Sequence, residues 1–245
     1  MTTQMIEDPL PTASAASLAA LDLFVLGRRA AELRDTRTSP RGAFVRRRQL
    51  VAPGEWRGPR DAAEAFADEA DLPALGALAG VRDAGVGAIV AGRDPELARA
   101  AAAAGLRVIW RLPFENGELD GTRLDRLAAL EPLSPSLGAL LPTPVGEPYG
   151  LDALRFFALA RLALPAGPRL FADVTTLGPR LAQMAFGFGA DELFGPIVAE
   201  RALRLGANAN NPALTRKEAA TLIRGAGLLP CERLADGTLE EVTPA

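Results

Sequence analysis

Two carboxylates stand at the ends of apolar runs that have the length of buried strands. Glu115 follows the run that ends at Leu112, and Asp173 lies near the end of the run that begins at Arg169. A carboxyl group in such a place suits proton transfer, because burial and nearby charge move its pKa toward the working pH. Glu115 and Asp173 are therefore our candidates for an acid–base pair. The sequence leaves their separation open, and a strand-end carboxylate also occurs without any catalytic role.

The chain contains no histidine and a single cysteine, Cys231. The missing imidazole excludes a serine–histidine–aspartate triad and a histidine-ligated zinc site. A lone cysteine also excludes a disulfide within the chain. We therefore expect no bound metal and no resident cofactor.

Further side chains next to predicted strand ends are candidates for binding a small-molecule ligand: Arg48, Trp110, Arg111, Thr175, Thr176 and Gly178. An arginine inside a barrel requires an anionic partner or ligand, whereas an arginine on an edge strand lies in water. A tryptophan either stacks on a planar ligand or packs in the core. The segment Thr175–Pro179 leads into a predicted helix, whose first N–H groups bind a carboxylate or phosphate unless the threonines only cap it.

Short apolar runs alternate with helical patterns, and these elements must position the candidate side chains. The predicted strands are Ala43–Val51, Val86–Ala91, Leu106–Leu112, Leu137–Leu141, Arg169–Val174 and Glu192–Ile197. The predicted helices are Leu18–Arg34, Pro59–Ala70, Pro73–Ala84, Pro95–Ala104, Thr122–Leu130, Gly150–Leu164 and Gly178–Phe188. Asp94-Pro95 and Gly105 mark the two ends of one helix, and Thr215 with Glu218 forms a capping box that opens the last one.

Repeated strand–helix alternation with buried-type strands predicts the α/β class. We expect a partial or distorted (β/α) barrel of about six parallel strands, although alternation alone also permits an open sheet. Residues 1–17 are expected to form a flexible tail, and residues 18–245 a single barrel-like domain with a C-terminal helix and strand. Ligands are expected at the carboxyl ends of the strands.

Charge and hydropathy narrow the class of partner. The formal net charge is −3 and the basic residues are scattered among acidic ones, which gives no attraction to nucleic acid. No apolar run reaches the ~18 to 20 residues that a membrane span needs, and the N-terminal residues lack a basic and then apolar leader. We therefore expect a cytoplasmic protein that contacts neither nucleic acid nor membrane.

Three segments carry a resemblance to a known family. They are Leu154–Leu162 (LRFFALARL), Leu177–Leu193 (LGPRLAQMAFGFGADEL) and Leu214–Gly227 (LTRKEAATLIRGAG). They are similar to the C-terminal half of the radical S-adenosylmethionine enzymes of the futalosine menaquinone pathway and of deazaflavin synthesis, of the aminofutalosine synthase and dehypoxanthine futalosine cyclase types. Leu21–Leu33 and Ala43–Leu50 resemble the helix and first strand that precede the catalytic motif of that family.

One departure from the family decides what the resemblance implies. A CxxxCxxC motif follows the first strand in the family, whereas Val51–Gly58 contains no cysteine here. Three thiolates hold the [4Fe–4S] cluster of such enzymes, so a chain with Cys231 alone is expected to lack the cluster and the radical reaction.

The resemblance and the missing thiols together predict a cluster-free pseudoenzyme that is an accessory or ligand-binding protein. We expect it to form a homo-oligomer or a heteromer with an active relative. An alternative is a non-radical enzyme that uses strand-end carboxylates on a nucleoside-like or quinone-precursor-like substrate. A third interpretation is a purely structural homo-oligomer whose barrel rim is filled by its own side chains.

Overall fold

The computed structural model describes residues 15–46, 48–50, 64–71, 78–83, 85–147, 149–164, 168–198, 213–234 and 236–243. Ten strands form one sheet in the order β12-β11-β1-β8-β7-β6-β5-β4-β3-β2. Their bounds are β1 Arg41–Phe44, β2 Arg48–Leu50, β3 Glu64–Asp68, β4 Ala88–Ala91, β5 Arg107–Phe114, β6 Leu137–Pro144, β7 Arg169–Asp173, β8 Glu192–Phe194, β11 Leu229–Arg233 and β12 Leu239–Glu241. A separate pair joins β9 (Ile197–Val198) to β10 (Leu214–Thr215).

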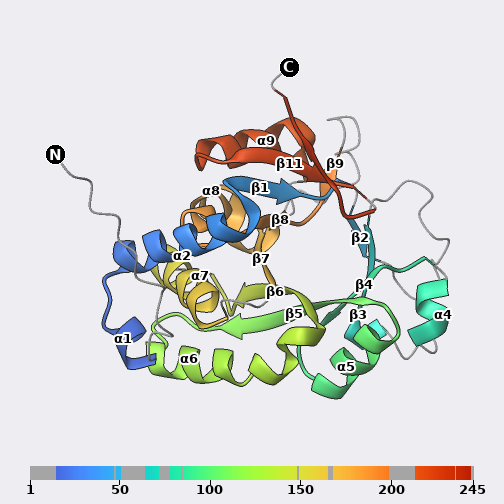
Figure 1. Ribbon diagram of the computed structural model, residues 1–245, viewed down its shortest axis with the longest axis horizontal. Helices are drawn as coiled ribbons and strands as arrows, with labels where there is room; N and C mark the ends of the chain where they lie inside the picture. Colours follow the sequence, from blue (N-terminus) through green and yellow to red (C-terminus); the bar gives the residue numbers. More distant parts are fainter. Residues whose placement is uncertain are drawn as a thin grey trace.

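The large sheet curls into a half-barrel of mostly parallel strands, which confirms the predicted fold class (Figure 1). Among the described strands of this sheet, β11 and β12 alone pair in the antiparallel sense. The sheet has more strands than the six that alternation suggested, because β3 lies in a predicted helix and the C-terminal strands β11 and β12 extend the sheet beyond β1.

The predicted first strand, Ala43–Val51, divides into β1 and β2, which pair at different places. β1 pairs with β8 and with β11, whereas β2 pairs with β3. β1 and β2 therefore lie at different places in the sheet, and β11 is the second neighbour of β1.

The predicted helix Pro59–Ala70 is wrong in its described part. Residues 64–68 form β3, and Glu69–Asp71 form a 3₁₀ turn, while residues 59–63 lie outside the described residues. The alanine-rich local pattern favours a helix, but Phe66 is in register with Ala88 of β4, and pairing on both sides of β3 overrides that weak preference.

The α-helices lie on the outside of the curl (Figure 1). They are α1 Ala15–Ala19, α2 Leu23–Thr38, α4 Leu78–Asp83, α5 Pro95–Ala103, α6 Asp120–Ala128, α7 Gly150–Ala163, α8 Val174–Phe186 and α9 Arg216–Gly225. A further 3₁₀ segment, Glu131–Ser136, precedes β6. The predicted helix Leu18–Arg34 is two helices, because Asp22 accepts the Phe24 N–H at 2.8 Å and starts α2 afresh.

The helix-end signals read from the sequence are confirmed where the structure describes them. Asp94 accepts N–H groups of Glu96 and Leu97 ahead of α5, and Gly105 has a φ of +80° after it. Thr215 and Glu218 bond reciprocally at the start of α9. Within the described residues, no helix combines the length and apolar character needed to cross a membrane.

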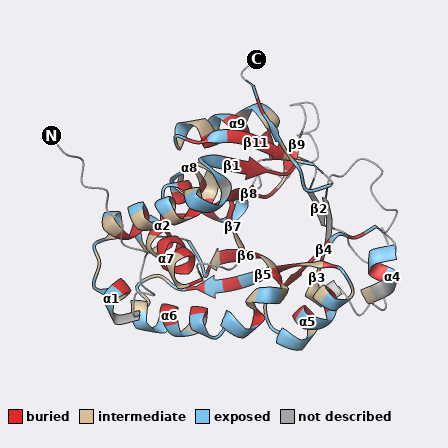
Figure 2. Cartoon of the chain, in the orientation of Figure 1, coloured by how far each residue is buried: buried red, intermediate tan, exposed pale blue. Residues whose placement is uncertain are grey.

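The two faces of the sheet bury different residues. Val108, Trp110, Leu112 and Phe114 of β5 belong to the large outer core under the helices, where Phe114 stacks on Phe156 of α7 at 4.6 Å between ring centroids. The inner face holds a smaller apolar cluster: Ala88, Val90, Ile109, Ala139, Leu141, Phe171 and Phe194. Buried residues accordingly run along the strands, while the outward surfaces of α5 and α6 are exposed (Figure 2).

Candidate functional site

The inner face of the half-barrel is apolar in its middle and charged at both ends. Side chains two positions apart on a strand share a face, so Arg169 and Asp173 of β7 point to the same side as the inner-cluster residue Phe171. Glu192 and Phe194 of β8 do likewise. The Phe171 and Phe194 rings stack at 5.6 Å between centroids. Asp173 follows Phe171 on the same face of β7 and is in register with Phe194 of β8.

Paired charges lie at the start of β8, where Glu192 is in register with Phe171 of β7. The carboxylate of Glu192 has no exposed surface and accepts hydrogen bonds from Arg169 at 2.6 Å and from Arg233 at 2.9 Å. These contacts join β7 and β8 to β11, which lies beyond β1 in the sheet. Parallel barrels bind their ligands at the carboxyl ends of the strands.

A pocket of about 230 Å³ opens at the carboxyl ends of β4 and β5. Its lining comprises Glu69, Val90, Ala91, Gly92, Arg93, Arg111 and Pro113. Glu69 accepts the N–H of Gly92 at 2.8 Å and that of Arg93 at 3.3 Å, which fixes the turn after β4. A Cβ on Gly92 would lie 2.7 Å from the carbonyl oxygen of Arg111, so the close approach of these two strand ends requires glycine.

An ion pair links a residue that lines the pocket to the end of a neighbouring strand. Arg111 of β5 donates from Nη2 to Asp68 of β3 at 3.0 Å, and 46% of the Arg111 side chain is exposed. The other Asp68 oxygen accepts the N–H of Ala70 at 3.1 Å. Arg111 was among the residues predicted from the sequence, whereas Asp68 and Glu69 were not, because both lie in a segment predicted to be a helix.

Asp173 is a buried acid at this end of the barrel. Only 8% of it is exposed, and Oδ1 accepts bonds at 2.8 Å from both the N–H and the hydroxyl of Thr175. Burial raises the pKa of Asp173 above its ordinary value, while the bonds from Thr175 and Thr176 and the positive charge of Arg111 oppose that rise. A carboxyl group that keeps its proton to higher pH can act as a hydrogen-bond donor or acid.

The threonines and Gly178 lie at the start of α8 beside Asp173. Thr175 and Thr176 are both exposed, and the cap of this helix is Asp173, not a threonine. Gly178 has a φ of +75°, which kinks the element just before Pro179. Of the predicted residues, Arg111, Asp173 and Thr175 are thus the ones that the fold gathers near the carboxyl end of the sheet.

Three predicted residues lie elsewhere or cannot be placed. Trp110 is 5% exposed and packs in the outer core, on the face opposite to Arg111. The side chain of Arg48 lies outside the described residues, whereas its neighbour Arg46 is paired with Glu232 at 2.7 Å. Glu115 is exposed at the start of the β5–α6 loop.

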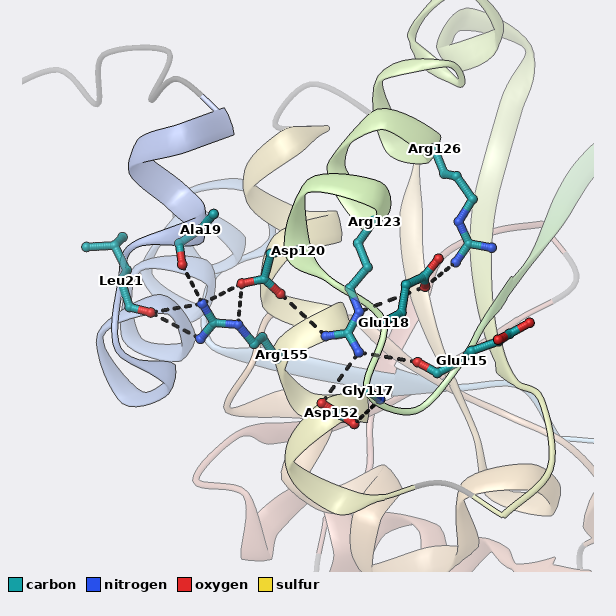
Figure 3. A network of polar contacts seen from close by, with 10 residues as sticks. All are labelled: Ala19, Leu21, Glu115, Gly117, Glu118, Asp120, Arg123, Arg126, Asp152 and Arg155. Atoms are coloured by element: carbon teal, nitrogen blue, oxygen red, sulfur yellow. Dashed lines mark hydrogen bonds and ion pairs between the residues drawn. The ribbon is translucent and has the colours of Figure 1, made fainter.

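The carbonyl oxygen of Glu115 belongs to a network that anchors this loop (Figure 3). The buried guanidinium of Arg123 donates to that oxygen at 3.3 Å and lies 3.5 Å from Asp120 and 3.4 Å from Asp152. Arg155 bonds Asp120 at 2.6 Å and carbonyl oxygens between α1 and α2. Three arginines (Arg123, Arg126 and Arg155) form ion pairs there with three carboxylates (Glu118, Asp120 and Asp152), and we assign the network a structural role in holding the rim.

The donors of this chain do not fit the iron–sulfur cluster that the resemblance implies. Cys231, the only thiol in the sequence, is 2% exposed on β11 in register with Ala43. Burial raises the pKa of the Cys231 thiol, which disfavours the thiolate that ligates iron. Among the described residues, no group of three or more cysteine, aspartate or glutamate side chains is arranged to hold a metal ion.

Comparison with known proteins identifies sequences and a structure that are similar to this chain. No family model matches the sequence. The chain is 37% identical over 84 residues to aminodeoxyfutalosine synthase of Thermus thermophilus, which covers 34% of this chain and 23% of that protein. It is 27% identical over 158 residues to the 5-amino-6-(D-ribitylamino)uracil–L-tyrosine 4-hydroxyphenyl transferase 1 of Methanosarcina barkeri, covering 56% of this chain and 42% of that one.

The matched parts span less than half the length of each of these curated relatives. Among solved structures, methylornithine synthase has the same fold, with a TM-score of 0.60 over 91% of this chain and 95% of that chain at 12% identity. Sequence and fold together show that this chain is a relative of the radical S-adenosylmethionine enzymes of the futalosine and deazaflavin pathways.

Proposed function

We propose that this protein is a cluster-free relative of those enzymes that binds a small molecule at the carboxyl end of its half-barrel. The observation that carries the proposal is the pocket between β4 and β5, which lies where parallel barrels bind ligands and is lined by both charged and apolar groups. The absence of cysteine from Val51–Gly58 supports the loss of radical chemistry.

The ligand class is proposed from the relatives. Their names specify aminodeoxyfutalosine, an aminouracil bearing a ribityl chain, and L-tyrosine, so we propose a nucleoside-like or quinone-precursor-like compound. A pocket of about 230 Å³ is smaller than most drug-sized sites, which favours recognition of one ring or one polar arm of such a compound. We further propose a cytoplasmic protein that works beside another subunit, either a second copy or an active relative.

A second candidate function is acid–base catalysis at the same end of the barrel. It is favoured by Asp173, because burial raises the pKa of its carboxyl group and Thr175 fixes one of its oxygens. Asp173→Asn should then abolish turnover of any compound that the protein converts. Full turnover in that variant would remove this second candidate.

Anaerobic reconstitution with iron and sulfide tests the absence of the cluster. We expect the wild-type protein and Cys231→Ala to retain the same low amount of iron, and neither to cleave S-adenosylmethionine after reduction. A brown protein that carries four irons per chain and cleaves the cofactor would overturn the proposal.

Calorimetric titration tests ligand binding directly. The probes are aminodeoxyfutalosine, 5-amino-6-(D-ribitylamino)uracil and L-tyrosine, and the blocking variant is Pro113→Phe, which places a ring in the pocket. Val145→Phe is the matched control, because Val145 is 53% exposed and does not line the pocket. We expect one probe to bind the wild type and the control but not Pro113→Phe. Absence of binding by every probe, or equal binding to both variants, would refute the proposal.

A further inference from the structure

The carboxylates in and beside the pocket already have partners within the protein. Asp68, which lies beside the pocket, accepts the Ala70 N–H with one oxygen and Arg111 with the other. Glu69, which lines it, accepts two backbone N–H groups with Oε2, while its Oε1 lies 3.9 Å from Nε of Arg93. The negative charge of both carboxylates is therefore already offset in part by N–H groups and arginines.

The two guanidinium groups, in contrast, have donors to spare. Arg111 uses Nη2 on Asp68, and its Nε and Nη1 bond no other described residue. Arg93 contacts Glu69 only beyond hydrogen-bond distance, and 90% of its side chain is exposed. A guanidinium presents five N–H donors in a planar fork, which matches a carboxylate or phosphate in a bidentate geometry.

We propose that the pocket selects ligands that carry a small anionic group, which binds Arg111 in competition with Asp68. This inference rests on the proposed ligand-binding function and names the chemical class that the site accepts. The ion pair of Arg111 with Asp68 holds the guanidinium over the pocket when no ligand is bound. An incoming carboxylate or phosphate takes its free donors, and Asp68 then weakens ligand binding because it already holds part of the same charge.

This arrangement predicts that substitutions of Arg111 and of Asp68 change the affinity for the anion in opposite directions. Arg111→Gln removes the donors, so binding of the anion should weaken by about tenfold or more, the effect of losing a charged hydrogen bond. Asp68→Asn removes the competing charge while its carbonyl oxygen can still accept the Ala70 N–H, so binding should tighten by about two- to fivefold. A purely structural ion pair would instead make both variants bind less well.

The test is a titration of wild type, Arg111→Gln and Asp68→Asn with 4-hydroxybenzoate and its neutral partner 4-hydroxybenzamide. Inorganic phosphate in a separate titration distinguishes a carboxylate site from a phosphate site. Asp83→Asn is the matched control, because Asp83 forms an exposed pair with Arg82 at 3.2 Å outside the pocket. Urea unfolding of every variant confirms that it is folded.

We expect 4-hydroxybenzoate to bind more tightly than the benzamide, with opposite shifts in the two pocket variants and none in the control. Equal binding of benzoate and benzamide, or shifts of the same sign, would overturn the inference. If the inference fails in this way, the proposed function can still be correct. It stands if one of the relatives' compounds binds the wild type and Pro113→Phe abolishes that binding.

Discussion

Glu192 is the residue whose substitution should most clearly show how much buried ion pairs between β7, β8 and β11 stabilise the fold. Its carboxylate is wholly buried and accepts bonds from Arg169 at 2.6 Å and Arg233 at 2.9 Å. Hydrogen bonds to charged groups contribute ~1.5 to 3 kcal/mol each, and breaking a buried pair costs ~3 to 5 kcal/mol because a charge is left uncompensated. Gln retains the size and can place its carbonyl oxygen where both arginines bond Oε2, but it removes the negative charge that the two guanidinium groups share. We therefore expect Glu192→Gln to lower the free energy of unfolding by about 3 kcal/mol.

Urea unfolding followed by circular dichroism measures this change. An unchanged dependence of the unfolding free energy on urea concentration would show that the surface area exposed on unfolding is the same in both proteins. Glu240→Gln on the exposed strand β12 is the control and should shift stability by no more than ~0.5 kcal/mol. Replacing Glu192, Arg169 and Arg233 together by apolar residues should restore much of the loss, since no charge then stays buried alone. A cost for Glu192→Gln no larger than that of the control would refute the reasoning.

Three further substitutions test single elements of the site and fold. Because its pKa is raised, Asp173 binds its proton more tightly in the folded state than in the unfolded state, so the stability that this proton contributes is present at low pH and is lost as the pH rises. Urea unfolding at a series of pH values should therefore show the wild type losing stability relative to Asp173→Asn above about pH 4. A stability difference that stays constant with pH would contradict this. Gly92→Ala places a Cβ 2.7 Å from the Arg111 carbonyl oxygen and should lower the free energy of unfolding, measured by thermal unfolding, by ~1 to 3 kcal/mol. An unchanged melting temperature would show that the two strands can move apart without cost. Thr215→Ala removes the capping box and should cost ~1 kcal/mol in urea unfolding, against a smaller change for the exposed Thr221→Ala; equal costs would remove the cap as the cause.

The helix ends were predictable because a cap depends on neighbours in sequence. Asp94 lies two and three residues from the N–H groups it accepts, and Thr215 and Glu218 are three residues apart. The strands β4 to β8 were predictable in position for a related reason, since each is a short apolar run bounded by turn residues. Arg111 and Asp173 followed from them, as residues at the carboxyl ends of such runs.

Arg111 could be predicted from the sequence, whereas its neighbours Asp68 and Glu69 could not. Asp68 and Glu69 follow an alanine-rich segment that favours a helix, and only pairing with β2 and β4 makes residues 64–68 a strand. The same partners bring Asp68 to Arg111, which is 43 residues away in sequence. Trp110 is the converse case: its residue type suited a ligand, but the register of β5 turns it into the outer core.

The sequence by itself determined the similarity to radical S-adenosylmethionine enzymes, the absence of cysteines from Val51–Gly58 and the ends of several helices. Each of these depends on residue identity or on contacts within a few positions of the chain. Only the tertiary structure decided that β11 lies beside β1, that Asp68 faces Arg111, and that Asp173 is buried in register with Phe194. Those arrangements depend on strand register and sheet curl. Both are set by hydrogen bonds and packing between segments far apart in the chain, which no local pattern records.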